Sequence, residues 1–273
     1  MLTILNSISS LNAENALSGT QTNLQKTLTQ LSTGLRVNSG SDDAAGLSIA
    51  NGLQANVAAL TQSSQNASDG VGILQTADGA LSQVTSLLNR AVTLATEASN
   101  GGLSSSQATA LNTEYASIQS EIDTIGTTTN YNGTAVFGSS GTVFTSDGTS
   151  SGSSTTSVSV AALSSSDLKL TSSGTPLSTT AGATAELALI TAAISTVAAD
   201  RGAIGATVNQ LNASANVQST EVTNLTSAVN NIENADIGQT VAKMTQYNVL
   251  EQTGMAALSQ SNSMEQNVLK LLQ

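Results

Sequence analysis

The feature that most constrains the fold is an apolar repeat that advances by four and then three residues without a slip. Its register is Leu53, Val57, Leu60, Ser64, Ala67, Val71, Leu74, Asp78, Leu81, Thr85, Leu88, Val92 and Ala95. Only Ser64, Asp78 and Thr85 are polar in this run. About six heptads in succession exceed the three or four that identify a coiled coil, so we predict one long helix packed against partner helices.

Two more segments carry the same repeat. Asn100-Gly-Gly102 is a signal for the end of a helix, and Ser104 or Ser105 is suited to cap the next one, whose apolar positions are Leu111, Tyr115, Ile118, Ile122 and Ile125. A third repeat runs from Ile204 to Ile232, with Gln218 as its polar position. Because short links join antiparallel neighbours, we predict a mainly α fold, an elongated antiparallel helical bundle or coiled coil.

The middle of the chain has a different composition. Residues 138–184 are rich in Ser, Thr and Gly. Alternating residues at Thr156–Val160 and Leu168–Leu170, together with the β-prone Thr142–Phe144, predict short strands, and Asn132-Gly133 is a hairpin turn signal. We therefore predict a small β-hairpin region, with a flexible Ser/Gly linker as the alternative.

The composition excludes several kinds of chemistry. The chain has no Cys, His or Trp, so thiol and imidazole catalysis, a structural zinc site and disulfides are excluded. Seven basic and 18 acidic residues give a net charge of −11, which disfavours binding to nucleic acid. The sequence predicts no membrane-spanning stretch of the required ~18 apolar residues and no signal peptide, because Met1 has no basic flank. We expect no enzyme activity, no cofactor and no metal.

The terminal segments 1–40 and 237–273 are amphipathic, and two short helices with one apolar face each leave much of that face exposed. Copies of the chain would bury it on each other, and a contact that does not close builds a filament. The residues expected to pack between subunits are Leu24, Leu28, Leu31, Leu35, Val241, Met244, Leu250, Leu258, Val268, Leu269 and Leu272. The alternative is that both termini fold back on the monomer.

Charged residues cluster near the break after the first segment. Asp42 is placed to cap the long helix, and a metal site at Asp42-Asp43 is disfavoured because adjacent carboxylates point in different directions on a helix. Arg36 is expected to pair with these residues or with another subunit, and the alternative is a solvated charge without a partner. Glu233 and Asp236 are candidates to contact Arg36 or Arg90, and the spacing leaves the partner open.

Several sequence segments resemble those of a known protein family. Leu31-Ser-Thr-Gly-Leu-Arg-Val-Asn-Ser-Gly-Ser-Asp-Asp-Ala-Ala-Gly-Leu-Ser-Ile-Ala50 is similar to the N-terminal signature of the bacterial flagellin family. Ile232-Glu-Asn-Ala-Asp236 and the final Gln266-Asn-Val-Leu-Lys-Leu-Leu-Gln273 resemble the C-terminal signature, and Asn130-Tyr-Asn-Gly133 resembles the turn into the family's β region.

The resemblance implies a short form of flagellin without large outer domains. Residues 1–40 and 237–273 would form an inner coiled coil, residues 41–137 and 185–236 a helical rod, and residues 138–184 a small insert. The implied function is that of the structural subunit of the extracellular flagellar filament, which self-assembles into a helical tube for swimming motility.

The resemblance also implies partners. These are many copies of the chain itself, the flagellar cap, hook-junction proteins, an export chaperone and the type III export apparatus, without insertion into a membrane. In the family, a Toll-like receptor of the host contacts an Arg, a Leu and a Glu that match Arg90, Leu94 and Glu114. The alternative for Arg90 and Glu114 is a solvated ion pair between adjacent helices.

Two other functions stay open at this point. A hook–filament junction protein shares the terminal helices, and a flagellin-like surface adhesin would bind glycans through the exposed insert. A metallopeptidase in the insert needs His ligands, which the chain lacks.

Overall fold

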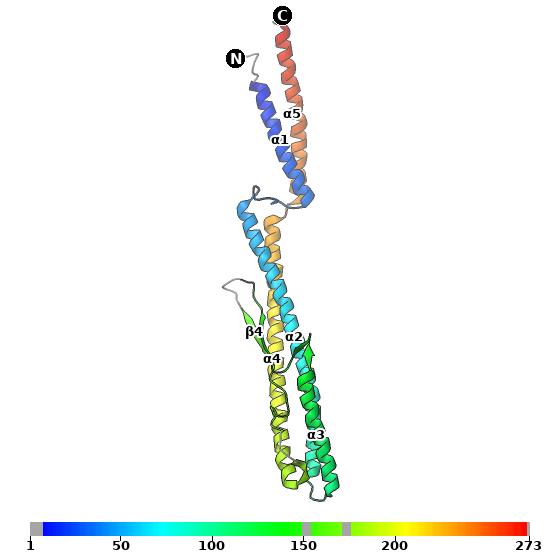
Figure 1. Ribbon diagram of the computed structural model, residues 1–273. Helices are drawn as coiled ribbons and strands as arrows, with labels where there is room; N and C mark the ends of the chain where they lie inside the picture. Colours follow the sequence, from blue (N-terminus) through cyan, green and yellow to red (C-terminus); the bar gives the residue numbers. More distant parts are fainter. Residues whose placement is uncertain (1–7, 149–153, 171–175, 272–273) are drawn as a thin grey trace. The chain divides into compact units, whose positions relative to one another are not determined.

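The computed structural model describes residues 8–148, 154–170 and 176–271, and the side chains of residues 265 and 268–271 lie outside the description. The described helices are α1 (Ile8–Thr33), α2 (Ala44–Ala98), α3 (Ser105–Thr128), α4 (Thr180–Glu233) and α5 (Ile237–Leu271), with a 3-10 turn η1 at Pro176–Ser178 (Figure 1). The described strands are β1 (Asn130–Tyr131), β2 (Thr134–Ala135), β3 (Ser140–Phe144) and β4 (Thr155–Ser159). The predicted mainly helical fold is confirmed.

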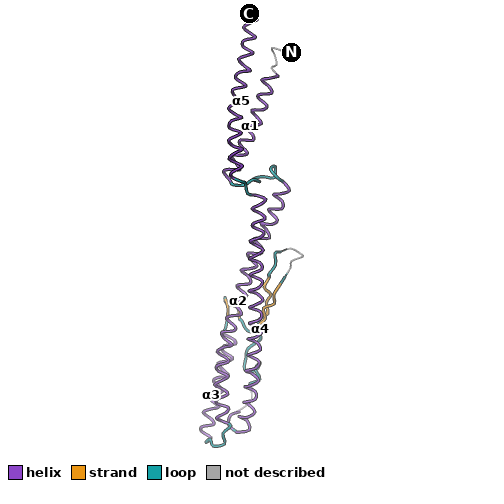
Figure 2. The backbone as a smooth tube through the Cα atoms, turned by 180° about the vertical axis from the view of Figure 1, so that it is seen from behind, coloured by secondary structure: helices purple, strands orange, loops and turns teal. Residues whose placement is uncertain are grey.

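The chain divides into two compact units. One unit comprises residues 1–55 and 224–273, and the other comprises residues 56–223. In the second unit, α2, α3 and α4 lie side by side, and two antiparallel strand pairs, β1–β2 and β3–β4, are attached to them (Figures 1 and 2).

From Leu60 onward, every second residue of the predicted apolar register of α2 is buried, so these buried residues are seven apart in sequence. Leu60, Ala67, Leu74, Leu81, Leu88 and Ala95 are buried as the heptads require. The other half of the predicted register is half-buried, with Val71 and Val92 packed against the core, and the further buried positions of α2 are Gly46, Ala50, Ser63, Gly70, Ala77, Val84, Ala91, Leu94 and Ala98. These residues are mostly small, so neighbouring helices and strands approach closely there. The three polar exceptions to the predicted repeat lie at partly exposed positions, where their side chains reach water or a partner.

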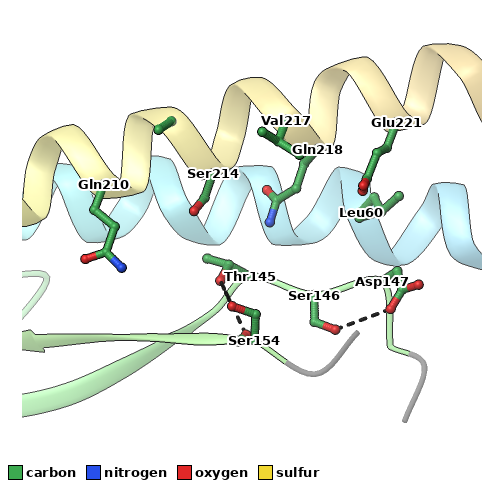
Figure 3. Close-up of a pocket in the computed structure, with 11 residues that line it drawn as sticks. Leu60, Thr145, Ser146, Asp147, Ser154, Gln210, Ser214, Val217, Gln218 and Glu221 are labelled. Atoms are coloured by element: carbon green, nitrogen blue, oxygen red, sulfur yellow. Dashed lines mark hydrogen bonds between the residues drawn. The ribbon is translucent and has the colours of Figure 1, made fainter. Parts of the chain in front are cut away.

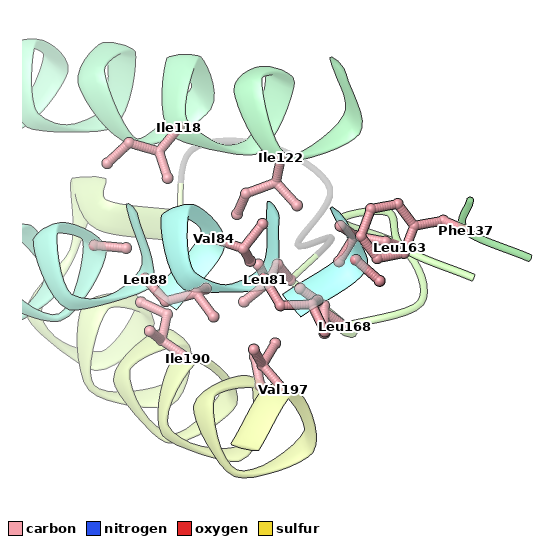
Figure 4. Packing of buried hydrophobic residues seen from close by; sticks show 14 of the residues in the cluster. Leu81, Val84, Leu88, Ile118, Ile122, Phe137, Leu163, Leu168, Ile190 and Val197 are labelled. Atoms are coloured by element: carbon pink, nitrogen blue, oxygen red, sulfur yellow. The ribbon is translucent and has the colours of Figure 1, made fainter. Parts of the chain in front are cut away.

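The core of the second unit forms where three helices meet. Leu81, Val84 and Leu88 of α2 lie between Ile118 and Ile122 of α3 on one side and Ile190 and Val197 of α4 on the other (Figure 4). Phe137, Leu163 and Leu168, from the segments outside the helices, join the same cluster (Figure 4). Aliphatic side chains therefore supply most of the apolar burial that stabilises this unit.

Helix α3 begins and ends for identifiable reasons. Ser104 is its N-cap, and a capping box joins Ser104 to Gln107 in both directions, which confirms one of the two predicted caps. The helix continues past Gly126 to Thr128. Gly126 is buried with the Leu163 carbonyl directly against its Cα, so a side chain has no room there. The glycine therefore serves close packing rather than helix termination.

The Asn132-Gly133 turn joins β1 to β2 with positive φ angles of 49° and 78°, as a hairpin of this type requires. Strands β3 and β4 pair from Ser140 with Ser159 to Phe144 with Thr155, so the linker alternative does not apply to these residues.

The expected strand at Leu168–Leu170 is wrong. The chain turns there, with Lys169 at φ 57°, and both leucines point into the core while Lys169 is exposed. Asp123 holds this turn, since it accepts hydrogen bonds from the Ser165 N–H at 2.6 Å and the Ser165 hydroxyl at 3.1 Å.

Helix α4 contradicts the expectation that no stretch of the chain is apolar enough to span a membrane. An 18-residue window within it has a mean hydropathy of 1.5, so by length and composition alone α4 is long and apolar enough to cross a membrane. The reason is its content of Ala, which scores as apolar without forming a run of large side chains. Ala183, Ile190, Ala193 and Val197 of α4 are buried in the helical core, and 28% of the apolar window is buried.

Candidate interaction surfaces

The terminal helices α1 and α5 pack against each other in opposite directions (Figures 1 and 2). The Ser10 hydroxyl donates to Asn262 at 3.3 Å, and the Gln21 amide donates to Glu251 at 3.4 Å. Gly254 lies against Leu17, where an added Cβ would come within 3.3 Å of Cδ1. Small and polar residues therefore set the close approach of the two helices.

This pair of helices has little core of its own. Within the described residues, its buried side chains are Thr27 and Thr240, and no large apolar side chain of α1 or α5 is buried. Large apolar side chains are instead exposed, among them Ile8 at 69%, Val249 at 53% and Met264 at 60%. Exposed apolar surface of this extent is typical of an interaction site.

The predicted packing residues occupy both faces of the pair. Leu28, Val241 and Leu250 are exposed, whereas Leu24, Leu31, Leu35, Met244 and Leu258 are half-buried. Val268 and Leu269 belong to α5, but their side chains lie outside the description, as does Leu272 altogether. Their contact with another subunit stays a prediction.

The terminal helices connect to α2 and α4 through a joint held by the main chain. Leu35 forms a bridge with Asn234, and the Ala235 N–H donates to the Gly34 carbonyl at 2.9 Å. The Arg36 N–H donates to the Glu233 carbonyl at 2.6 Å, and its guanidinium donates to the Ile232 carbonyl at 2.6 Å. Arg36 therefore binds the main chain of α4 rather than the carboxylates considered as its partners.

The two C-terminal carboxylates have other roles. Glu233 accepts hydrogen bonds from the Gln54 amide at 3.1 Å. Asp236 accepts from the Gln239 N–H at 3.1 Å and so caps α5. Neither carboxylate contacts Arg36 or Arg90.

The predicted cap at Asp42 is displaced by one residue. Helix α2 begins at Ala44, and Asp43 is its N-cap, accepting from the Gly46 N–H at 2.8 Å. Asp42 instead pairs with Lys26 at 2.8 Å and accepts from the Asn38 and Ser39 N–H groups.

The hydrogen bond from Lys26, followed by those from the main chain, lowers the pKa of Asp42 to about 2. Asp42 therefore fastens the end of α1 to the turn before α2. Among the described residues, no group of three acidic side chains could hold a metal ion here or elsewhere.

Arg90 and Glu114 form an ion pair between α2 and α3. The Arg90 Nε lies 2.7 Å from Glu114 Oε1, and both side chains are about half exposed. The pair lowers the pKa of Glu114 and raises that of Arg90. The predicted ion-pair alternative is thus confirmed. Leu94 is fully buried, whereas Arg90 and Glu114 are accessible, and contact of these three residues with a receptor stays a prediction.

The comparison with known families decides how this arrangement is interpreted. Residues 4–142 match the model of the bacterial flagellin N-terminal helical region, and residues 187–272 match that of the C-terminal helical region. The chain belongs to the bacterial flagellin family. The two matched regions contain the terminal helices, the joint and most of the helical core, and flagellin is a structural protein rather than an enzyme.

Individual flagellins are similar over part of their length. The chain is 42% identical to the B-type flagellin of Pseudomonas aeruginosa over 110 residues, which cover 40% of this chain and 22% of that protein. It is 43% identical to the phase 1 flagellin of Salmonella naestved over 102 residues, which cover 37% of this chain and 20% of that protein. The aligned part therefore spans about a fifth of these curated flagellins.

A solved flagellin structure is also similar. The crystal structure of Bacillus cereus flagellin matches with a TM-score of 0.49 and 29% identity, covering 56% of this chain and 88% of that one.

Two features of this flagellin-family chain escaped the sequence reasoning. Glu186 is 2% exposed and accepts a hydrogen bond of 2.5 Å from the Tyr115 hydroxyl, and burial raises the pKa of both groups. Gln218 is 3% exposed, and its amide has no hydrogen-bond partner among the described residues. The signal for Gln218 was present, because it is the polar position in the repeat of α4.

Proposed function

We propose that the chain is the structural subunit of an extracellular bacterial flagellar filament, built by self-assembly through the terminal helices. The exposed apolar surface of the α1–α5 pair carries this proposal, because burying it on other copies supplies the driving force for association. Membership of the flagellin family supports the same conclusion. The mechanism is mechanical, with identical subunits repeating one set of contacts along the filament.

The proposed domain division follows the family. The inner domain comprises residues 1–40 and 237–273, the rod domain comprises residues 41–137 and 185–236, and the insert comprises residues 138–184. The joint around the Leu35–Asn234 bridge lies at the proposed boundary between the inner and rod domains.

The partners that go with this function are the cap, the hook-junction proteins, an export chaperone and the export apparatus. A host Toll-like receptor would contact the Arg90–Glu114 pair, which is exposed on adjacent helices. These partners rest on the family resemblance and on the accessibility of that pair.

The test is polymerisation of the purified chain on fragments of its own filaments. Elongation is expected for the full chain and is expected to be abolished by deletion of residues 1–35 or 240–273. A deletion variant that still forms filaments of the same helical symmetry would contradict the role of the terminal helices. Glycan binding by a chain that never polymerises would favour the adhesin instead.

A matched pair of substitutions separates assembly from folding. Val249→Asn removes an apolar side chain that is 53% exposed, and Gln252→Asn changes an exposed polar residue on the same helix. We expect both monomers to keep their helical content by circular dichroism and only Val249→Asn to slow elongation. Equal elongation rates would show that this face stays uncovered in the filament.

A further inference from the structure

The second unit carries an acidic cavity of about 430 Å³ between α4 and the loop that follows β3. Asp147 of the loop and Glu221 of α4 line it, together with Ser146, Gln210 and Gln218, over Leu60 of α2 (Figure 3). The side chains of Gln210, Gln218 and Glu221 extend from α4 toward the loop (Figure 3). The lining is therefore dominated by hydrogen-bond acceptors with two negative charges.

Gln218 shows that this cavity is more than a gap between surface residues. Its side chain is 3% exposed, yet neither Oε1 nor Nε2 has a hydrogen-bond partner among the described residues. A buried amide left unpaired costs about 1–3 kcal/mol, so such a group marks a place where a bound water or a polar ligand completes the hydrogen bonding. The acceptor Oε1 and the two carboxylates suit a positively charged ligand that donates hydrogen bonds, whereas Nε2 needs an acceptor such as a carboxylate of the lining.

The second unit has few cations that could supply this ligand. It contains 11 acidic and three basic residues, which are Arg90, Lys169 and Arg201. Arg90 pairs with Glu114, and Arg201 pairs with Asp78 through two hydrogen bonds of 2.7 and 3.2 Å. Lys169 is exposed and forms no ion pair with any residue that the structure describes.

Lys169 is held in a defined position. Its φ angle of 57° places it at the tip of a turn between two buried leucines, and its N–H donates to the Ser166 carbonyl at 3.0 Å. The turn is fastened to α3 through Asp123 and Ser165. A lysine on a fixed turn loses less entropy on binding than one on a mobile loop.

Lys169 and the acidic cavity lie too far apart to meet in one copy of the chain. Its neighbour Leu168 lines a second cavity with Thr196 and Asp200 of α4. Asp200 and Gln218 are 18 residues apart on the same helix, about 27 Å at 1.5 Å per residue. The extended side chain of a lysine is several times shorter than this separation.

We propose that the acidic cavity binds the Lys169 ammonium of a second copy of this chain. The three donors of the ammonium match Gln218 Oε1 and the carboxylates of Asp147 and Glu221. Because the two partners are different surfaces, the contact is heterologous and repeats from copy to copy. The proposal rests on the proposed function, and it places an attractive contact between bodies that otherwise repel through their negative charge.

Cross-linking of the unmodified chain tests the contact directly. A carbodiimide joins an amine to a carboxylate that it touches, with loss of water, so filaments treated with it should yield a peptide linking Lys169 to Glu221 or Asp147. Mass spectrometry should find this peptide in filaments and not in monomers. Filaments without it would overturn the proposal.

Elongation kinetics on filament fragments give the second test. Lys169→Gln should slow elongation about fivefold to tenfold at low salt, and high salt should narrow the difference. Ser166→Glu, which makes the same change of charge in the same exposed turn, is the control and should have a smaller effect. The charge exchange Lys169→Glu with Glu221→Lys should restore the rate that Lys169→Glu alone loses.

The outcomes separate the two proposals. If the wild-type chain does not elongate, the proposed function fails and this contact fails with it. A second outcome is that the wild-type chain elongates, that Lys169→Gln and Ser166→Glu have equal elongation rates, and that the charge exchange does not restore the rate lost in Lys169→Glu. In that case only the contact is overturned. Loss of assembly in EDTA, with no Lys169 cross-link, would assign the cavity to a divalent cation and also overturn the contact.

Discussion

Glu186 should make the stability of the helical core fall as the pH rises. Its carboxyl group is 2% exposed, its hydrogen-bond partner is the neutral Tyr115 hydroxyl, and burial raises its pKa above the ordinary value. The folded chain therefore holds this proton more tightly than the unfolded chain does. The stabilisation is complete below the ordinary pKa of about 4.5 and is lost as the pH rises through the raised value of the folded state.

The magnitude is bounded by linkage. One titrating group changes the free energy of unfolding by at most about 1.4 kcal/mol per pH unit, and only between its two pKa values. Glu186→Gln keeps an acceptor for Tyr115 and removes the titration. Because Gln does not titrate, the free energy of unfolding of this variant should lack the decrease of up to about 1.4 kcal/mol per pH unit that Glu186 causes in wild type. The variant should therefore be the more stable of the two at pH values above the raised pKa.

The assay is urea unfolding of the monomer, followed by circular dichroism at several pH values between 4 and 9. The quantity to compare is the difference between wild type and Glu186→Gln, because the other carboxylates titrate equally in both. Tyr115→Phe is the companion variant, expected to cost about 1–3 kcal/mol because it leaves the buried carboxyl without its donor. A difference that does not change with pH would refute the reasoning.

Two further predictions concern glycines and the joint. Gly70→Ala should destabilise the chain by about 1–3 kcal/mol, because the new Cβ would lie 2.8 Å from Val143 Cγ2. Gly79→Ala should stabilise it by about 1 kcal/mol, because the new Cβ meets nothing within 4 Å. Thermal unfolding of both variants tests this. The stabilising contacts of Asp42 are complete above its ordinary pKa of 3.8 and should be lost as the pH falls toward about 2, and Asp42→Asn should lose the Lys26 ion pair at every pH. Faster amide exchange in the turn before α2 is the expected readout, and unchanged exchange in Asp42→Asn would contradict it.

The sequence predicts the helices well because their signal is repeated many times. The repeats of α2, α3 and α4 each contain several large aliphatic residues at helical spacing, and the fold follows from them. The additional buried positions of α2 were not predicted because Gly70, Ala77 and Ala91 have little or no apolar side chain and give no signal in a pattern of hydrophobicity. Small residues become core positions through the closeness of the neighbours, which only the structure shows.

Local hydrogen-bond networks were harder to predict than helices. Choosing between Asp42 and Asp43 as the cap requires the path of the turn, because both carboxylates lie within reach of free N–H groups. Lys169 illustrates the same difficulty, since alternation of Leu with Lys suits both a strand and a turn with one positive φ angle. The pairing of Tyr115 with Glu186 joins helices that are far apart in sequence, and no local pattern contains it.

The alternation of larger and small buried residues along α2 has a consequence for how the protein changes during evolution. Each seven-residue step adds one thin layer of similar composition, so burial grows in proportion to helix length rather than to volume. Removing one layer from α2 together with the facing layer of α4 would leave the layers on either side in register, whereas removing three or four residues would rotate the faces away from each other. We therefore expect length changes in α2 and α4 to be tolerated best in units of seven residues.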